Sequence, residues 1–226
     1  NEYKSCIFAI TKRKDGWDAL RHYEILACGT IPVFEEIDEC PKNTLALLPK
    51  DLIKQGNKLF NKFQNYNIKD IPVNEYTILI EKLLEYTRKH LTTKKMAEYV
   101  LDKSGNLSNV SNVLFIKSNK ENYMTSLIIY GFKQIFGKKC YDYPKDQHIY
   151  LDSIFNGLGF TYSRHVSSDC HEEITNIEEQ IKSKQFDLII YPAYEETLEH
   201  LELVLENYPP EKIIIMCFGD HNVNSK

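Results

Sequence analysis

Apolar residues follow two patterns along the chain: short continuous runs, and longer segments with an apolar residue at every third or fourth position. Short apolar runs are typical of strands buried on both faces of a parallel sheet, and the longer spacing is typical of amphipathic helices. Strands are predicted at residues 5–11, 30–37, 112–117, 138–143, 186–191 and 212–218. Helices are predicted at residues 16–28, 49–63, 73–91, 92–105, 123–136, 172–184 and 195–207.

Strands that alternate with helices predict an α/β fold with mainly parallel sheets. The small, polar and aperiodic segment "SGNLSNVSN" (104–112) is the predicted boundary between two Rossmann-like units, residues 1–105 and 112–226. Residues 144–169 are too long for a plain connection, so they contain small elements or serve a function.

Composition narrows the range of functions. The 226 residues are 42% hydrophobic and 27% charged, which is ordinary for a globular protein. A net charge of -4 and a pI near 6.0 give no basic field, so nucleic acid is not an expected partner. The six cysteines form no C-x-x-C motif, and neither a signal peptide nor an apolar run of membrane-spanning length is present, which favours a cytoplasmic protein. The Asn at position 1 and the polar end after a strand suggest a fragment of a longer chain.

The first predicted helix carries the densest group of candidate functional residues. Asp15 is the expected N-cap of this helix, Asp18 can reach back to the cap, and Gly29 is expected to end it. A helix start attracts anions, Gly16 allows one to approach the backbone, and Arg21 can bind a phosphate. A purely structural reading fits equally well, since acidic residues often cap helices and Arg21 can pair with a nearby carboxylate.

A resemblance adds to this reading. Residues 15–53, "DGWDALRHYEILACGTIPVFEEIDECPKNTLALLPKDLI", resemble a signature of glycosyltransferases encoded by giant viruses, and more distantly a segment of exostosin-like and other GT-B enzymes. The resemblance implies a GT-B-like fold in which this helix holds a nucleotide-sugar donor. Glu24 matches the donor-binding Glu of such enzymes, whereas Gly16 stands where many of them carry a second Glu.

The later half resembles the same viral group through residues 113–145, 157–162 and 186–191. The implied reaction transfers a sugar from a nucleotide-sugar donor to a hydroxyl of a glycan, protein or lipid in the host cytoplasm. No Asp-x-Asp occurs, which fits a reaction without a metal, and no Gly-x-Gly-x-x-Gly supports a dinucleotide cofactor. No cofactor is therefore expected.

The expected site residues follow from both arguments. The donor-binding residues are Asp15, Gly16, Trp17, Asp18, Arg21 and Glu24, and the candidate catalytic residues are His22, Asp220 and His221. Asp220 and His221 follow the last predicted strand, and a solvated turn is the alternative for them. His22 can stabilise a leaving phosphate when it is protonated.

Weaker candidates lie in the second half. His165, Cys170 and His171 form a partial zinc pattern without a second ligand pair. His148 lies in the long loop, and Tyr143 and Tyr150 can stack on a sugar ring, although most of the 15 tyrosines must be structural. The rival function is a non-catalytic module derived from a transferase, which the missing second Glu and the unusual order of the two halves favour.

Overall fold

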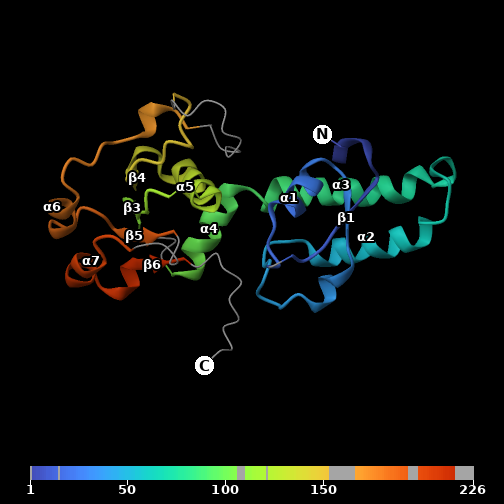
Figure 1. The fold of residues 1–226 in the computed structure, drawn as a ribbon, viewed down its shortest axis with the longest axis horizontal. Helices are drawn as coiled ribbons and strands as arrows, with labels where there is room; N and C mark the ends of the chain where they lie inside the picture. Colours follow the sequence, from blue (N-terminus) through green and yellow to red (C-terminus); the bar gives the residue numbers. More distant parts are fainter. Residues whose placement is uncertain are drawn as a thin grey trace. The chain divides into compact units, whose positions relative to one another are not determined.

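The structure is a computed structural model that describes residues 2–14, 16–105, 110–120, 122–152, 166–192 and 198–216. Within these ranges the chain is a mixed α/β protein, and all of its paired strands are parallel, as the sequence predicts. The chain divides into two compact units between Thr92 and Thr93. Each unit contains its own sheet (Figure 1).

The first unit has two paired strands and three helices. Strands β1 (Phe8–Thr11) and β2 (Ile31–Phe34) pair in register from Phe8↔Ile31 to Thr11↔Phe34. The helices are α1 (Leu20–Ala27), α2 (Lys50–Phe63) and α3 (Val73–His90), and short 3-10 turns occupy Glu2–Ser5, Glu35–Glu39 and Ile68–Asp70. Gly29 has a φ of +74° after α1, which is the left-handed end expected from the sequence.

Strand β2 forms the centre of the first core, because all four of its residues are buried. Helices α1, α2 and α3 each contact it. Asn57 of α2 forms hydrogen bonds with both backbone polar groups of Phe34 in β2. Its side chain accepts a hydrogen bond from the Phe34 N–H at 2.8 Å and donates one to the Phe34 carbonyl at 2.7 Å. A helix side chain thus takes the place of a neighbouring strand at the end of β2.

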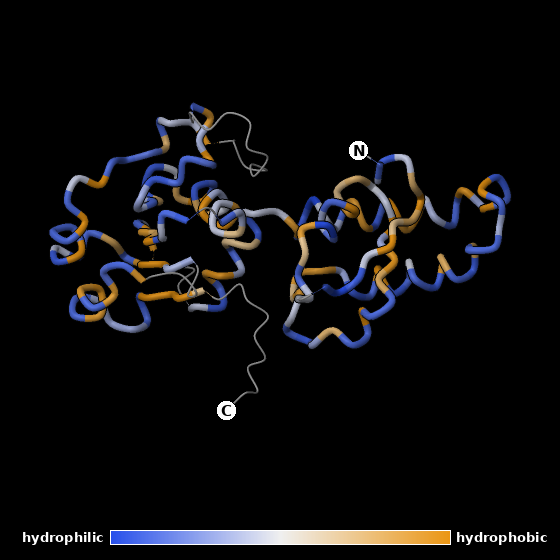
Figure 2. Tube along the Cα trace, in the orientation of Figure 1, coloured by the Kyte–Doolittle hydropathy of each residue, from blue (hydrophilic) through white to orange (hydrophobic). Residues whose placement is uncertain are grey.

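The second unit has a four-stranded sheet in the order β4-β3-β5-β6. Its strands are β3 (Val113–Ile116), β4 (Cys140–Tyr143), β5 (Leu188–Tyr191) and β6 (Ile213–Ile215). Its helices are α4 (Thr93–Lys103), α5 (Tyr123–Phe136), α6 (Ile177–Lys182) and α7 (Leu201–Asn207), with 3-10 turns at Gly137–Lys139, Ser168–Cys170 and Pro210–Lys212. Figure 2 shows the hydrophobic colour along β5 and β6.

Both faces of this sheet are covered, which explains why β3, β5 and β6 are apolar without alternation. Val113 and Phe115 of β3 pack in one core with Phe132 of α5, whereas Leu114 and Ile116 pack in the other core with residues of α6 and α7. The unit is therefore a three-layer α/β sandwich.

The structure corrects two expectations about the boundaries. The units divide at Thr92, not within residues 104–112, so α4 belongs to the second unit, where it packs closely on α5. Helices α6 and α7 are also shorter than predicted. Within the described part of the long loop after β4, Tyr150 and Val166 form an isolated parallel bridge.

The contact between α4 and α5 requires a glycine. A Cβ on Gly131 would collide with the backbone carbonyl of Thr93 and lie 3.3 Å from the Cβ of Ala97. We therefore expect Gly131→Ala to lower the free energy of unfolding by about 1–3 kcal/mol, because a helix backbone must move to admit the methyl group. Urea unfolding followed by circular dichroism measures this change. The matched control is Lys94→Ala at an exposed position of α4. An equal free energy of unfolding in the two variants would contradict a tight contact between α4 and α5.

Candidate functional site

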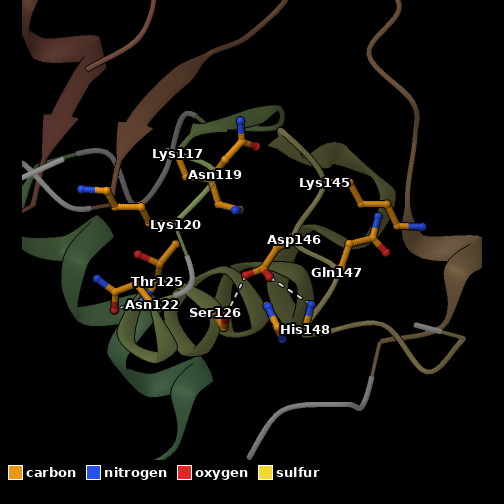
Figure 3. A pocket seen from close by; sticks show the side chains of 10 residues that line it. All are labelled: Lys117, Asn119, Lys120, Asn122, Thr125, Ser126, Lys145, Asp146, Gln147 and His148. Carbon is orange, nitrogen blue, oxygen red and sulfur yellow. Dashed lines mark hydrogen bonds between the residues drawn. The ribbon is translucent and has the colours of Figure 1, made fainter. Parts of the chain in front are cut away.

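A polar pocket lies in the second unit where β3 and β4 end (Figure 3). Its volume is about 190 Å³, and its ten lining residues come from the loop after β3, the first turns of α5 and the loop after β4: Lys117, Asn119, Lys120, Asn122, Thr125, Ser126, Lys145, Asp146, Gln147 and His148. The carboxyl ends of parallel strands are the usual place for ligands in open α/β sheets. The pocket is therefore the candidate functional site.

The sequence after β3 builds a tight turn into α5. The Ser118 hydroxyl accepts a hydrogen bond from the Lys120 N–H at 3.1 Å. Asn122 is the N-cap of α5, and its side-chain oxygen accepts from the N–H groups of Met124 at 3.0 Å and Thr125 at 3.4 Å. The partial positive charge of a 14-residue helix thus lies at the pocket wall.

Positive side chains dominate the pocket. Lys117 and Lys120 come from the loop after β3, and Lys145 comes from the loop after β4 on the opposite side (Figure 3). The Lys145 Nζ also lies 4.5 Å from the ring centre of Tyr150, which limits where that side chain can go. The Lys117 Nζ donates a hydrogen bond to the Ser118 carbonyl at 3.1 Å. Among the residues that the structure describes, three lysines and one carboxylate line the pocket, so it suits an anion.

That carboxylate, Asp146, is used to hold the pocket together. Its Oδ2 accepts from the Ser126 hydroxyl at 2.7 Å, and its Oδ1 accepts from the His148 N–H at 3.1 Å. Asp146 is 2% exposed. Asp146 therefore links α5 to the loop after β4 through these hydrogen bonds. The three lining lysines outnumber this carboxylate, so the described lining of the pocket is positively charged.

Thr125 provides a second indication of a ligand. The residue is 3% exposed, and its hydroxyl has no hydrogen-bond partner within the described part of the chain. Buried hydroxyl groups are normally hydrogen-bonded, and each exception requires an explanation. A ligand oxygen in the pocket that Thr125 lines would supply the missing partner.

The first helix, where the sequence places the donor, has a different geometry from the one expected. Helix α1 begins at Leu20 with Ala19 at the N-cap and no side-chain cap, so the predicted start near Gly16 is wrong. Trp17 explains the difference: it is 7% exposed and packs in the core of the first unit, and the chain becomes helical only after it. Asp15 lies outside the described residues.

Arg21 is bonded within the protein. Its Nε donates to the Thr11 hydroxyl at 3.1 Å, and its Nη2 donates to the Lys12 carbonyl at 3.3 Å. The Arg13 guanidinium lies 5.1 Å from the Trp17 ring centre. In this structure Arg21 ties α1 to the end of β1.

His22 is 1% exposed, and both of its ring nitrogens are engaged. Nδ1 lies 2.9 Å from the Thr11 hydroxyl, and Nε2 lies 3.0 Å from the Trp17 carbonyl. The carbonyl can only accept, so Nε2 carries the proton and Nδ1 accepts from Thr11. Burial lowers the pKa of His22, and the nearby charge of Arg21 lowers it further. These contacts place His22 in the core, out of reach of a substrate.

The other expected donor residues are more accessible. Gly16 and Glu24 are half-buried, and Asp18 is exposed. Asp18 forms a hydrogen bond with Tyr23, and burial together with this carboxylate raises the pKa of Tyr23.

The remaining candidates have different outcomes. Asp220, His221 and His165 lie outside the described residues. Tyr150 is buried and bonds to Asp142, and His148 lines the pocket. Across the described ranges, His, Cys, Asp and Glu side chains form no group that could hold a metal ion.

Sequence reasoning missed most of the pocket. The segment after β3 contains no glycine-rich motif, and its lysines alone form no pattern that predicts a site. The available signal was three lysines and several amide side chains directly after two neighbouring buried strands.

Comparison with protein families, with curated proteins and with solved structures finds no match to this chain. Among the helices of the described residues, none has the length and apolar character needed to cross a membrane.

The burial of His22 predicts an acid-sensitive first unit. Because its pKa is lowered by folding, the unfolded chain binds more protons below about pH 6.5. The free energy of unfolding of the first unit is therefore unaffected by His22 above this pH, and it falls as the pH drops below it because the unfolded chain takes up a proton at His22. Trp17, the single tryptophan, reports the unfolding of this unit by fluorescence. We expect His22→Gln to remove this pH dependence and His90→Gln, at a half-buried position of α3, to retain it. The same pH dependence in both variants would contradict the assignment.

Proposed function

We propose that the protein is a glycosyltransferase of GT-B type that transfers a sugar from a nucleotide-sugar donor to a hydroxyl acceptor without a metal ion. The observation that carries this proposal is the pocket with three lysines at the carboxyl ends of β3 and β4. The proposal also draws on the resemblance of residues 15–53 and 113–145 to viral glycosyltransferases.

The chemistry of the pocket supports binding of the donor's diphosphate. Lysine ammonium groups and the start of a long helix are common phosphate-binding groups in α/β proteins. The Thr125 hydroxyl adds a neutral donor for a phosphate oxygen. A cavity of about 190 Å³ holds a diphosphate or a phosphorylated sugar, and is smaller than the roughly 300–1,000 Å³ typical of sites for larger ligands. The nucleoside would accordingly lie outside it.

We place the diphosphate in this pocket and not at the start of α1. The resemblance points to α1, but Arg21 and His22 already bond to groups of the first unit. A phosphate at α1 would have to compete with these contacts. Among the described lining residues of the pocket in the second unit, by contrast, the lysines outnumber the carboxylates.

The reaction assigns a definite task to the lysines. The acceptor oxygen forms a bond to the anomeric carbon, the bond from that carbon to the donor phosphate breaks, and the leaving nucleoside diphosphate keeps the electron pair. Lys117, Lys120 and Lys145 would stabilise the negative charge that develops on it. The proton of the acceptor hydroxyl passes to a base, for which Asp220 and His221 remain the sequence-based candidates.

A non-catalytic module that binds nucleotide sugars is the second candidate. The internal bonding of His22 favours it, since this residue cannot act as a base while both ring nitrogens are engaged. Release of nucleoside diphosphate from a bound donor distinguishes the two functions. An enzyme releases it when a suitable acceptor is added, whereas a binding module retains the intact donor.

Binding is tested by substituting the pocket lysines. Lys117→Ala and Lys145→Ala should each weaken nucleotide-sugar binding about tenfold or more, because each removes a charge-assisted contact of about 1.5–3 kcal/mol. A thermal-shift screen with UDP-, GDP- and CMP-sugars identifies the donor, since a ligand at 100 times its Kd stabilises the folded state by about 2.7 kcal/mol.

Two control variants complete this test. Lys139→Ala removes an exposed lysine of the same unit and should leave binding unchanged. Arg21→Ala should lower the stability of the first unit without weakening binding. Loss of binding in Arg21→Ala, with binding retained in both pocket variants, would return the donor site to α1 and contradict our placement.

A further inference from the structure

A buried ion pair lies behind the pocket. The Lys133 Nζ of α5 and the Asp142 Oδ1 of β4 are 2.9 Å apart, and their side chains are 2% and 0% exposed. The Lys133 Nζ also donates to the carbonyls of Cys140 at 2.6 Å and Cys170 at 3.3 Å. The ammonium group thus has three acceptors for its three N–H donors, and none of these donors is left for a ligand.

The Asp142 carboxylate accepts hydrogen bonds from two residues of the loop after β4. Its Oδ1 accepts from the Tyr150 hydroxyl at 2.7 Å, and its Oδ2 accepts from the Asp146 N–H at 2.8 Å. The Nδ1 of His171 lies 3.6 Å from Oδ1. Burial by itself would raise the pKa of Asp142, but the neighbouring His171 and the charge of Lys133 outweigh it and lower the pKa to about 2. Asp142 is therefore a carboxylate at neutral pH.

These bonds form a continuous link from the ion pair to the pocket. Asp142 fixes the backbone of Asp146, and the side chain of Asp146 then fixes the Ser126 hydroxyl and the His148 N–H. Ser126 and His148 both line the pocket. The loop that carries Lys145 is consequently attached at Asp146, the next residue.

Stability is a poor explanation for such a pair. Replacing a buried ion pair by apolar groups of similar size is often neutral or stabilising, because the cost of desolvating two charges offsets their attraction. A carboxylate is nevertheless a strong acceptor for a backbone N–H. The pair is better explained by the geometry that it imposes on the loop.

We propose that Asp142 is a positioning residue for the pocket: it holds the Asp146 backbone, and through it Lys145 and His148, in the arrangement that binds phosphate. Lys133 neutralises the charge of Asp142 and takes no part in ligand binding. This inference rests on the proposed function, because the pocket must bind a phosphate for the positioning to matter.

Two double variants test the proposal. Lys133→Met/Asp142→Asn and Lys133→Met/Asp142→Leu both remove the ion pair and the bonds of Lys133 without leaving an unpaired charge. The Asn side chain keeps an oxygen that accepts from the Asp146 N–H, whereas Leu has no acceptor. We expect the Asn variant to bind pyrophosphate within about threefold of the unaltered protein, and the Leu variant to bind it at least tenfold more weakly.

The comparison separates positioning from stability. Pyrophosphate affinity is measured by calorimetry, thermal stability by circular dichroism, and exchange of the Asp146 amide hydrogen by NMR. Positioning predicts fast exchange and weak binding in the Leu variant alone. Equal pyrophosphate affinity in both variants would overturn the proposal. So would a pyrophosphate affinity that correlates with the melting temperature and not with the exchange rate of the Asp146 amide.

A measurement on the unaltered protein covers the case in which the Leu variant does not fold. The Asp146 amide should then exchange more slowly than the other amides of residues 145–148, and exchange at the rate of an unprotected amide would overturn the proposal. If the unaltered protein binds no pyrophosphate, the proposed function fails. The exchange of the Asp146 amide still reports whether Asp142 holds the loop.

Discussion

The parallel arrangement of the strands is the constraint on which the second unit depends. Parallel strands all end at the same edge of a sheet, so the segments that follow neighbouring strands must meet there. Strands β3 and β4 are neighbours, and described residues from the segments that follow them, within 117–126 and 145–148, line one pocket. Lysines that are 25 to 28 positions apart in the sequence, Lys120 and Lys117 on one side and Lys145 on the other, are thereby placed around one cavity.

The two units use their polar side chains differently. In the first unit, Arg21 and His22 satisfy Thr11, the Lys12 carbonyl and the Trp17 carbonyl, and so join α1 to β1 and to the segment between them. In the second unit, the buried Lys133 and Asp142 form an ion pair, and Asp142 also accepts a hydrogen bond from the Asp146 N–H of the loop after β4. Of the lysines that line the pocket, Lys117 donates to the Ser118 carbonyl and Lys145 lies over the Tyr150 ring, and both contacts are with uncharged groups, so their positive charge is not neutralised by them. The second unit is therefore the better candidate for phosphate binding.

Periodicity predicted most of the elements, because buried strands and amphipathic helices leave a strong pattern. Helix α5 begins and ends at Tyr123 and Phe136, as expected, and each predicted strand contains an observed one. The start of α1 was wrong because a capping pattern at Asp15 and Asp18 outweighed the tendency of Trp17 to be buried. The boundary was misplaced because packing of α4 on α5 through Gly131 has no local signal. The pocket was missed for a similar reason: its residues belong together only once the strand order is known.

NMR chemical shifts during a titration with pyrophosphate test the central claim most directly, because one experiment reports on both units. The account predicts that amide signals of residues 117–126 and 145–148 shift in a saturable manner, while those of residues 11–24 stay unchanged. Shifts confined to residues 11–24 would contradict the account and would place the phosphate at the first helix.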